Sequence, residues 1–442
     1  MSLAHLYSRY LRLKAANAFV IIMVLLTSCT ASKVKFVKKE LISLEHTFHN
    51  HTGFVLYDPV ESEYLINYKA DKYFTPASNT KILTLYTCLH LLGDSIPALK
   101  YVQKGDSLIF WGTGDPSFLH PDLSHSHAYD FLKQSQRHLY FSSANFFDDH
   151  FGPGWAWDDY PYTFSSERSP FPVFGNYFTV KKDASQKLSI TNPVFKKYFW
   201  LNDSSTTSPA FVRSYESNSI DYFPQHQPAD IAIKIPFRYS DQLVAEILSD
   251  TLNKKVLLTD EPMQSVFNTA YSLPADSVYK RMMQVSDNMM AEQLLLVCSA
   301  MVGDSLRVQN AIDYALNNVF KDIDDELIWK DGSGLSRYNL FTPRSIVNIW
   351  EQLLTQYGRE RLFNILAVGG ESGTLKNYYK SEIAYIYGKT GTLSNNHSLS
   401  GFLITKSGRL LIFSLMNNNY AGSSIPVKKR MEQILLEVHE KF

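Results

Sequence analysis

The chain is short of the residues that build metal centres. It has three cysteines in 442 residues, and neither a CxxC nor an HExxH motif occurs. The histidine pairs His49/His51 and His125/His127 lie in loop-like stretches without further ligand residues close by. Because a zinc centre takes three or four such ligands, we expect no metal and no cofactor.

The chain also lacks a net charge. Lys+Arg and Asp+Glu both number 43, so no strong positive field is available for nucleic acid, which we exclude as the main partner. No long charge run, low-complexity tract or internal repeat is obvious. Hydrophobic residues make up 45% of the chain, enough for a substantial core. The length allows one large domain with an insertion, or two to three domains.

The sequence has no apolar run long enough to span a bilayer, which takes ~20 residues. The apolar run Phe19–Leu26 is shorter and follows Arg9, Arg12 and Lys14, which is typical of an export signal. The tetrapeptide LTSC after it resembles a bacterial lipobox, which implies cleavage before Cys29 and acylation of that thiol. An ordinary signal peptide with an incidental cysteine is the alternative.

We therefore expect a lipoprotein signal peptide over residues 1–28 and a polar tether over residues 29–40. The mature protein would be exported and anchored by lipid to a bacterial membrane, facing the periplasm. Only Cys88 and Cys298 would then remain, each on a probable apolar helix. Such cysteines can pair in an oxidising compartment or stay free, and the sequence leaves both possibilities open.

The order of elements predicts an α+β fold. A strand pair is expected at 53–58 and 63–68, and a buried helix begins at Pro76. Helical patterns return from residue 271, and the chain closes with two strands and a last helix. This order predicts an antiparallel sheet covered by helices and built from both chain ends.

The sequence pattern between these two parts of the chain is different. Short alternating runs, interrupted by Pro, Asn, Ser and Gly, fill residues 97–260, with one amphipathic helix near "SDQLVAEILSDTL". We expect an inserted β-rich region here. Residues 41–96 and 261–442 would then form the main domain.

A serine and a lysine lie one helical turn apart in "FTPASNTKILTLY". Ser78 and Lys81 therefore share a helix face. A serine hydroxyl is a poor nucleophile until a base takes its proton, and a buried lysine with a lowered pKa can serve as that base. Taken alone, the SxxK pattern is weak, and a helix cap is the stronger interpretation of Ser78.

Two further motifs favour catalysis. Ser286-Asp287-Asn288 begins another helical pattern, and Lys389-Thr390-Gly391 precedes the closing strands. A second serine can pass a proton to a leaving amine, and an asparagine amide both donates and accepts hydrogen bonds. A strand-edge Lys-Thr pair binds a carboxylate, and the glycine lets a substrate backbone lie close.

The set SxxK, SDN and KTG is the signature of class A β-lactamases and penicillin-binding proteins. The sequence resembles the class C low-molecular-mass penicillin-binding proteins, the D-alanyl-D-alanine carboxypeptidase/endopeptidase group. Four other stretches share in this resemblance: WGTGDPSF, GWAWDDYPY, DGSGLSRYNLFTP and GGESGTLKNYY. The family also carries its insertion between the first and second motifs, where the texture changes here.

The resemblance implies roles for the motif residues. Ser78 is the acylated nucleophile, Lys81 its base, and Ser286 relays the proton. Asn288 holds the substrate's amide. Lys389 and Thr390 bind the terminal D-Ala carboxylate. The backbone N–H groups of Ser78 and Thr392 form the oxyanion hole.

The resemblance also implies a binding region for the free end of a stem peptide, formed by Asp158, Arg337 and Ser394. A solvated loop role is the alternative for each of these three residues. The expected activity is that of a serine DD-peptidase acting on D-Ala-D-Ala stems of peptidoglycan, with β-lactams as covalent inhibitors. Carboxypeptidase and endopeptidase cleavage use one site, and the sequence does not separate them.

Two other functions compete with this one. A class A β-lactamase needs a Glu-x-x-x-Asn element between SDN and KTG, and none stands out, since Glu292 lies on the helix directly after SDN. A β-lactamase or esterase of the same fold remains an alternative. A catalytically silent, lipid-anchored peptidoglycan-binding protein is the other.

Overall fold

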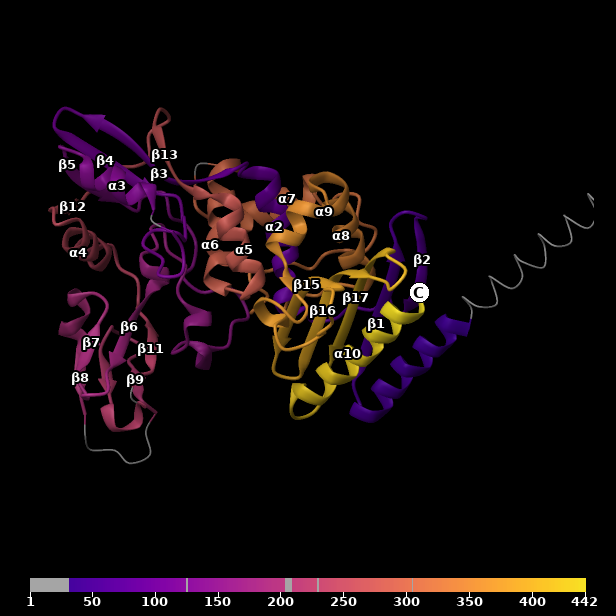
Figure 1. Ribbon diagram of the computed structural model, residues 1–442. Coiled ribbons are helices and arrows are strands. Elements are labelled where there is room, and N and C mark those ends of the chain that lie inside the picture. Colours follow the sequence, from indigo (N-terminus) through magenta and orange to yellow (C-terminus); the bar gives the residue numbers. More distant parts are fainter. Residues whose placement is uncertain (1–31, 125, 203–208, 229, 304) are drawn as a thin grey trace, which may run out of the picture.

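The computed structural model describes residues 32–124, 126–202, 209–228, 230–303 and 305–442. The predicted signal peptide, Cys29 and His125 lie outside the described residues. Within those ranges, no helix combines the length and the apolar character that crossing a membrane requires. The molecule has two lobes, one built from both chain ends and one from the middle of the chain (Figure 1).

A six-stranded antiparallel sheet forms the centre of the first lobe, in the order β14-β15-β16-β17-β1-β2. Its first strand pairs with β17, so the two chain ends build one sheet and the α+β prediction is confirmed. The strands are β1 (His51–Asp58), β2 (Glu63–Tyr68), β14 (Ala367–Val368), β15 (Ile386–Leu393), β16 (Asn396–Ile404) and β17 (Leu410–Asn418).

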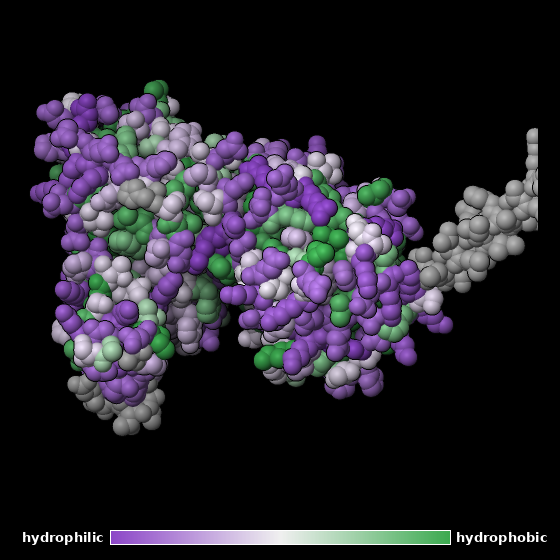
Figure 2. Space-filling view, in the orientation of Figure 1, coloured by the Kyte–Doolittle hydropathy of each residue, from purple (hydrophilic) through white to green (hydrophobic). Residues whose placement is uncertain are grey.

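Two terminal helices cover one face of this sheet. They are the helix over 32–48 and α10 (Ser424–Lys441), whose apolar side chains pack with those of β1, β16 and β17. The predicted tether over 29–40 is therefore wrong from residue 32 on, because Val37 and its helical neighbours Leu41 and Leu44 are buried in this core. On the side seen in Figure 2, the outer surface over α10 is mostly hydrophilic.

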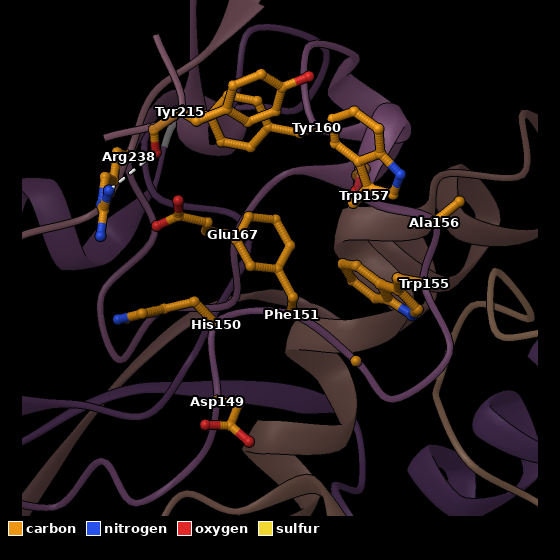
Figure 3. Close-up of a pocket in the computed structure, with 12 residues that line it drawn as sticks. Asp149, His150, Phe151, Trp155, Ala156, Trp157, Tyr160, Glu167, Tyr215 and Arg238 are labelled. Atoms are coloured by element: carbon orange, nitrogen blue, oxygen red, sulfur yellow. Dashed lines mark hydrogen bonds between the residues drawn. The ribbon is translucent and has the colours of Figure 1, made fainter. Parts of the chain in front are cut away.

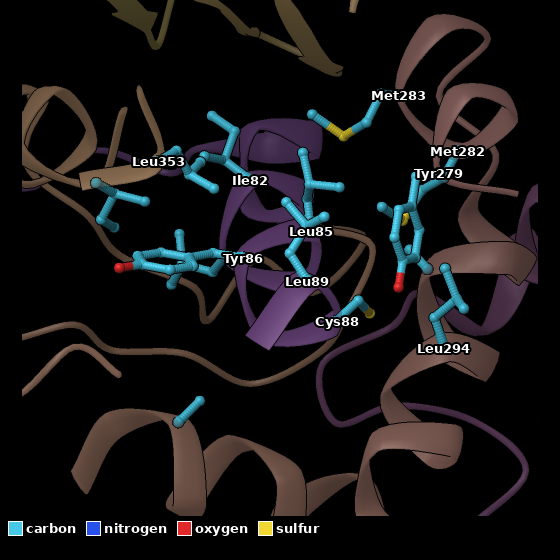
Figure 4. Close-up of a cluster of buried hydrophobic side chains, with 14 of the residues drawn as sticks. Ile82, Leu85, Tyr86, Cys88, Leu89, Tyr279, Met282, Met283, Leu294 and Leu353 are labelled. Atoms are coloured by element: carbon cyan, nitrogen blue, oxygen red, sulfur yellow. The ribbon is translucent and has the colours of Figure 1, made fainter. Parts of the chain in front are cut away.

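The other face carries a larger helical layer around α2 (Lys81–Leu91). Every residue of α2 from Lys81 to Leu89 is buried, and Figure 4 shows its side chains packed among those of the surrounding helices. These helices are α5 (Ala275–Gln284), α6 (Asn288–Val302), α7 (Val308–Asn318), α8 (Pro343–Tyr357) and α9 (Arg359–Ile365). The prediction of a central buried helix is confirmed.

The two cysteines that the sequence left either free or paired lie close together in this layer. Cys88 on α2 and Cys298 on α6 are both buried free thiols, and their Sγ atoms lie 3.6 Å apart. Burial, followed by the neighbouring thiol, raises the pKa of Cys88 well above its ordinary value. The pair therefore packs as two apolar groups between the helices.

The second lobe has its own hydrophobic core and a five-stranded sheet in the order β12-β5-β4-β3-β13. Its strands are β3 (Ser95–Lys104), β4 (Ser107–Gly112), β5 (His138–Ser142), β12 (Val256–Leu258) and β13 (Asn268–Pro274). Because β13 pairs with β3, this sheet extends beyond residue 260, the expected end of the insertion. The expected amphipathic helix is α4 (Asp241–Leu252), while α3 (His127–Gln134) was not predicted.

Two small sheets complete this lobe, β11-β6-β7 and β8-β10-β9. Their strands are β6 (Tyr177–Lys182), β7 (Leu188–Ile190), β8 (Phe199–Leu201), β9 (Phe211–Arg213), β10 (Ile220–Tyr222) and β11 (Ala232–Pro236). Short 3-10 turns are η1 (Ala77–Thr80), η2 (Trp157–Asp159), η3 (Thr163–Ser165), η4 (Phe174–Asn176), η5 (Pro193–Tyr198), η6 (Pro224–His226) and η7 (Gly373–Leu375).

Candidate active site

Ser78 lies in the 3-10 turn η1, directly before α2. Its side chain caps neither helix start, so the cap interpretation of Ser78 is wrong. The residue before it, Ala77, has a φ of +50°, a conformation that a non-glycine residue adopts only under constraint. Gly334 presses against this turn, since a Cβ there would lie 1.9 Å from the Ala77 carbonyl oxygen.

Lys81 points from the first turn of α2 at the serine. Its Nζ lies 3.0 Å from Ser78 Oγ, 2.6 Å from Asn288 Oδ1 and 2.7 Å from the Ser333 carbonyl oxygen. The last two are acceptors only. A neutral amine therefore gives them its two hydrogens and turns its lone pair to the serine hydroxyl.

Burial sets the protonation of this lysine. Desolvation is the largest influence and lowers the pKa of Lys81 to about 8, against the carboxylates of Glu292, Asp331 and Asp287, which raise it. About a tenth of the amine is then neutral at pH 7, far more than for an exposed lysine. This is what a general base for Ser78 requires.

The SDN motif forms the corner before α6. Asp287 is the N-cap, and its Oδ1 accepts from the Met290 N–H at 3.2 Å. Ser286 has a φ of +62°, a second strained residue at the site. Asn288 opens the helix, and besides accepting from Lys81 it donates from Nδ2 to the Phe164 carbonyl oxygen at 2.9 Å.

The KTG motif lies within β15, whereas we expected it just ahead of the closing strands. Lys389 is buried and donates from Nζ to Ser286 Oγ at 2.8 Å. Burial and then the Lys81 cation hold the pKa of Lys389 well below its ordinary value. A Cβ on Gly391 would lie 2.5 Å from the Pro76 carbonyl oxygen and 2.9 Å from Ser78 N, so only glycine lets β15 approach η1 this closely.

Two threonines of β15 face the open side of the site. Thr390 Oγ1 donates to Thr374 Oγ1 at 2.7 Å, and Thr392 Oγ1 lies 2.8 Å from Nδ1 of His397. Burial is the main influence that lowers the pKa of His397 to about 3, so this imidazole is neutral. His397 thus orients Thr392 without adding charge, a role that the sequence analysis missed.

One cleft of about 690 Å³ brings most of the predicted site residues together. Those that line it are Ser78, Ser286, Asn288, Thr390, Thr392, Asp158, Arg337 and Ser394. Arg337 Nη1 donates to the Ser394 carbonyl oxygen at 3.4 Å, which joins two of the expected stem-binding residues. Lys81 and Lys389 are buried and do not line the cleft. Cys29 lies outside the described residues.

Glu292 is a further site residue, with a role that sequence reasoning did not find. Its Oε1 accepts from the Ser333 N–H at 2.7 Å, and its Oε2 accepts from Nε and Nη2 of Arg168 at 3.0 and 2.6 Å. Glu292 thereby fixes the loop that contains Ser333, whose carbonyl oxygen accepts a hydrogen bond from Lys81. The available signal was a charged residue within an otherwise apolar helix, "MMAEQLLLV".

The "DGSGLS" stretch forms this loop. Asp331 accepts from the N–H groups of Gly334 at 2.9 Å and Ser336 at 2.6 Å, and from Trp155 Nε1 at 2.9 Å. One buried carboxylate therefore ties the loop behind Lys81 to the second lobe. Across the described ranges, no group of three or more His, Cys, Asp or Glu side chains is arranged to hold a metal ion.

Known proteins resemble this chain along most of its length. DacB of Haemophilus influenzae, a D-alanyl-D-alanine carboxypeptidase, is 22% identical over 86% of this chain and 88% of that relative. The D-alanyl-D-alanine carboxypeptidase of Actinomadura sp. (strain R39) is 25% identical over 84% and 78%.

The fold has a solved counterpart in the crystal structure of penicillin binding protein 4 (dacB) from Haemophilus influenzae. It has a TM-score of 0.75 at 20% identity and covers 90% of this chain and 99% of that one. The penicillin-binding fold that the sequence predicts is thereby confirmed. Residues 39–438 match the D-Ala-D-Ala carboxypeptidase 3 (S13) family, and the chain therefore belongs to this family.

Proposed function

We propose that the protein hydrolyses D-Ala-D-Ala stem peptides of peptidoglycan through an acyl-enzyme on Ser78, and that β-lactams acylate the same serine. Membership of the family makes the protein a serine D-Ala-D-Ala carboxypeptidase. The observation that carries the residue assignment is the position of Lys81 Nζ, which lies 3.0 Å from Ser78 Oγ and has two acceptor oxygens, Asn288 Oδ1 and Ser333 O, as its other partners.

Acylation begins with transfer of the Ser78 proton to Lys81 Nζ. Oγ then attacks the carbonyl carbon of the penultimate D-Ala, and the carbonyl oxygen becomes an oxyanion. The backbone N–H groups of Ser78 and Thr392 donate to that oxygen, a role supported by the close approach of β15 to η1 at Gly391.

Collapse of the tetrahedral intermediate breaks the peptide bond. The leaving amine of the terminal D-Ala needs a proton, and Ser286 passes one to it. Lys389, which donates to Ser286 Oγ, keeps the hydroxyl hydrogen of that serine directed away from itself and toward the cleft. Ser286 recovers its proton from Lys81, which is then neutral again. Water hydrolyses the ester on Ser78: Lys81 takes a proton from the attacking water and passes it to Oγ as the ester bond breaks.

The terminal carboxylate of the substrate binds at β15. Thr390 and Thr392 line the cleft and offer their hydroxyls, while Lys389 lies buried behind them. An anion in this place raises the pKa of Lys389 toward its ordinary value, since it stabilises the charged form. Substrate binding thus charges the lysine that assists it.

Asn288 holds the amide on the acyl side. Its Nδ2 donates to the Phe164 carbonyl oxygen in this structure, so it must exchange that acceptor for a substrate carbonyl. Asp158, Arg337 and Ser394 bind the free end of the stem, a role supported by their place along the same cleft. Both contacts leave the Lys81–Ser78 pair undisturbed.

We propose that residues 41–96 and 261–442 form the peptidase domain and that residues 97–260 form an insertion, to whose sheet β13 adds a strand from beyond residue 260. The separate hydrophobic core of the second lobe supports this division. We also propose a signal peptide over 1–28 and a lipid anchor at Cys29 that faces the protein to the periplasm. If so, a Cys29→Ser variant leaves the membrane fraction, and mass spectrometry finds no acyl mass on its N-terminal peptide.

Mass spectrometry after penicillin treatment tests the catalytic proposal. We expect one penicilloyl adduct, on Ser78, that a folded Ser78→Ala variant does not form. An intact protein without any adduct would refute the acyl-enzyme and favour the silent binding protein. Turnover of a chromogenic cephalosporin at many per second would favour the β-lactamase instead.

A further inference from the structure

A small cavity opens from the catalytic cleft beside the threonines of β15. It has a volume of about 230 Å³, and Thr374, Thr390 and Thr392 line both the cleft and the cavity. The rest of its lining comes from Leu375, Tyr378, Tyr379, His397 and Lys428. The two threonines of β15 therefore lie at the boundary between the cleft and the cavity.

The cavity lies on the α10 side of the sheet. Successive side chains of a strand point to opposite faces. Lys389 reaches Ser286 in the helical layer, so Thr390 points to the other face. Ile386, which shares that face with Thr390, packs into the hydrophobic core formed with α10. The hydroxyls proposed to bind the substrate carboxylate are thus on the side of β15 away from Lys389.

Lys428 reaches the cavity from α10. Ser424, one turn earlier on the same face of this helix, lines the catalytic cleft. After burial, the Lys428 cation is the next influence that lowers the pKa of His397 to about 3, and His397 Nδ1 lies 2.8 Å from Thr392 Oγ1. Because that imidazole is neutral, Lys428 is the only charged side chain among the described residues that line the cavity.

No described carboxylate compensates the charge of Lys428. Burial lowers the pKa of Lys428 from its ordinary value, and no neighbouring acid offsets that effect. Glu432, one turn further along α10, accepts instead from the Tyr379 N–H. A partly buried cation in this state is stabilised by an anion that binds near it.

A larger cavity of about 580 Å³ adjoins the cleft at Ala156 and suits an anion less well. Figure 3 shows the carboxylates of Asp149 and Glu167 among its lining residues. Arg238 also lines it, and its Nη1 donates to the Tyr215 carbonyl oxygen at 3.0 Å. Two carboxylates in the wall disfavour a negative ligand there, whereas the small cavity attracts one.

The lysines on the two faces of β15 differ in burial. Lys389 is fully buried, and its pKa is held well below its ordinary value, so the free enzyme offers little of its charge. Lys428 is only half-buried, and contact with solvent helps to keep it charged. A positive charge is therefore present on the α10 side of the threonines before any substrate binds.

We propose that Lys428 is a specificity-determining residue, whose charge favours substrates with a free terminal carboxylate at Thr390 and Thr392. This role rests on the proposed function, in which that carboxylate binds at β15. One additional, partly exposed cation near a carboxylate should strengthen its binding by about tenfold. Because Lys428 does not line the cleft at Ser78, the effect should fall on KM and leave kcat unchanged.

Two substrates that differ only in this charge test the proposal. One is an acylated D-Ala-D-Ala peptide, and the other is the same peptide with a terminal carboxamide. Lys428→Gln should lower the preference for the carboxylate, measured as the ratio of the two kcat/KM values, by about tenfold through KM. Lys428→Arg should restore most of the preference. Lys429, the exposed next residue of α10, supplies the matched control, since Lys429→Gln should keep the ratio.

A binding measurement separates this test from catalysis. In a folded Ser78→Ala background, calorimetry should show that Lys428→Gln raises the dissociation constant of the acylated D-Ala-D-Ala peptide by about tenfold and that Lys429→Gln does not. A ratio or a dissociation constant that Lys428→Gln leaves unchanged would overturn the role of Lys428 and spare the peptidase. A wild-type protein that cleaves neither substrate, while peptide binding still depends on Lys428, would instead count against the proposed function.

Discussion

The pH dependence of acylation tests the assignment of Lys81 as the base. Only the neutral amine accepts the Ser78 proton, and burial lowers the pKa of Lys81 to about 8. The neutral fraction is then about 9% at pH 7 and about 91% at pH 9. The second-order rate constant for acylation by benzylpenicillin should therefore rise about tenfold between these pH values, because this constant reports the ionisation of the free enzyme.

Rapid quenching with detection of the penicilloyl adduct measures this rate from pH 6 to pH 9.5. Lys389 also has a lowered pKa, so its titration must be separated from that of Lys81. The Lys389→Arg variant does this, since a guanidinium stays charged across the range, and its rising limb should keep the midpoint near pH 8. A rate that is flat between pH 7 and pH 9 in both proteins would refute Lys81 as the base.

Three substitutions probe the surrounding structure. Glu292→Gln leaves the buried guanidinium of Arg168 with Asp148, 3.6 Å away, as its remaining carboxylate. Urea denaturation should show a loss of about 3–5 kcal/mol in unfolding free energy, and a stable variant would contradict the role given to the Glu292–Arg168 pair. Gly391→Ala places a Cβ 2.5 Å from the Pro76 carbonyl oxygen, so we expect the protein to lose about 1–3 kcal/mol of stability and to be labelled more slowly by penicillin. Unchanged labelling would argue against the close approach of β15 to η1. Ser286→Ala removes the proposed proton relay and should lower kcat for a D-Ala-D-Ala peptide by about 10²–10⁴-fold in steady-state assays, whereas a near-normal kcat would exclude the relay.

Local patterns were sufficient for the elements around the site. Helical spacing of apolar residues predicted α2, because a helix brings residues three and four apart onto one face. The two closing strands were predicted as well, and β16 and β17 are buried along nearly their whole length. The tether was mispredicted for a related reason. Lysines dominate the segment 33–39, yet Val37 falls on the face that the sheet covers, and the presence of that sheet is a property of the whole fold.

Sequence motifs named the candidate catalytic residues because SxxK, SDN and KTG each place their functional groups within three or four consecutive positions. Everything that tunes those residues comes from elsewhere in the chain. Ser333 supplies a carbonyl oxygen to Lys81, Glu292 fixes that carbonyl's loop, and His397 orients Thr392. The first two contacts join residues far apart in sequence, whereas His397 is only five residues from Thr392 and reaches it across the turn between β15 and β16.

The sequence by itself determined the α+β class, the motifs that hold the proposed nucleophile and its neighbours, and the resemblance that the family match then confirmed. Only the tertiary structure decided that Lys81 is buried with a lowered pKa and that Lys389, which donates to Ser286, is buried and does not line the cleft. The physical reason is that desolvation and hydrogen-bond geometry depend on what surrounds a side chain in space, and most of those surroundings come from distant parts of the chain.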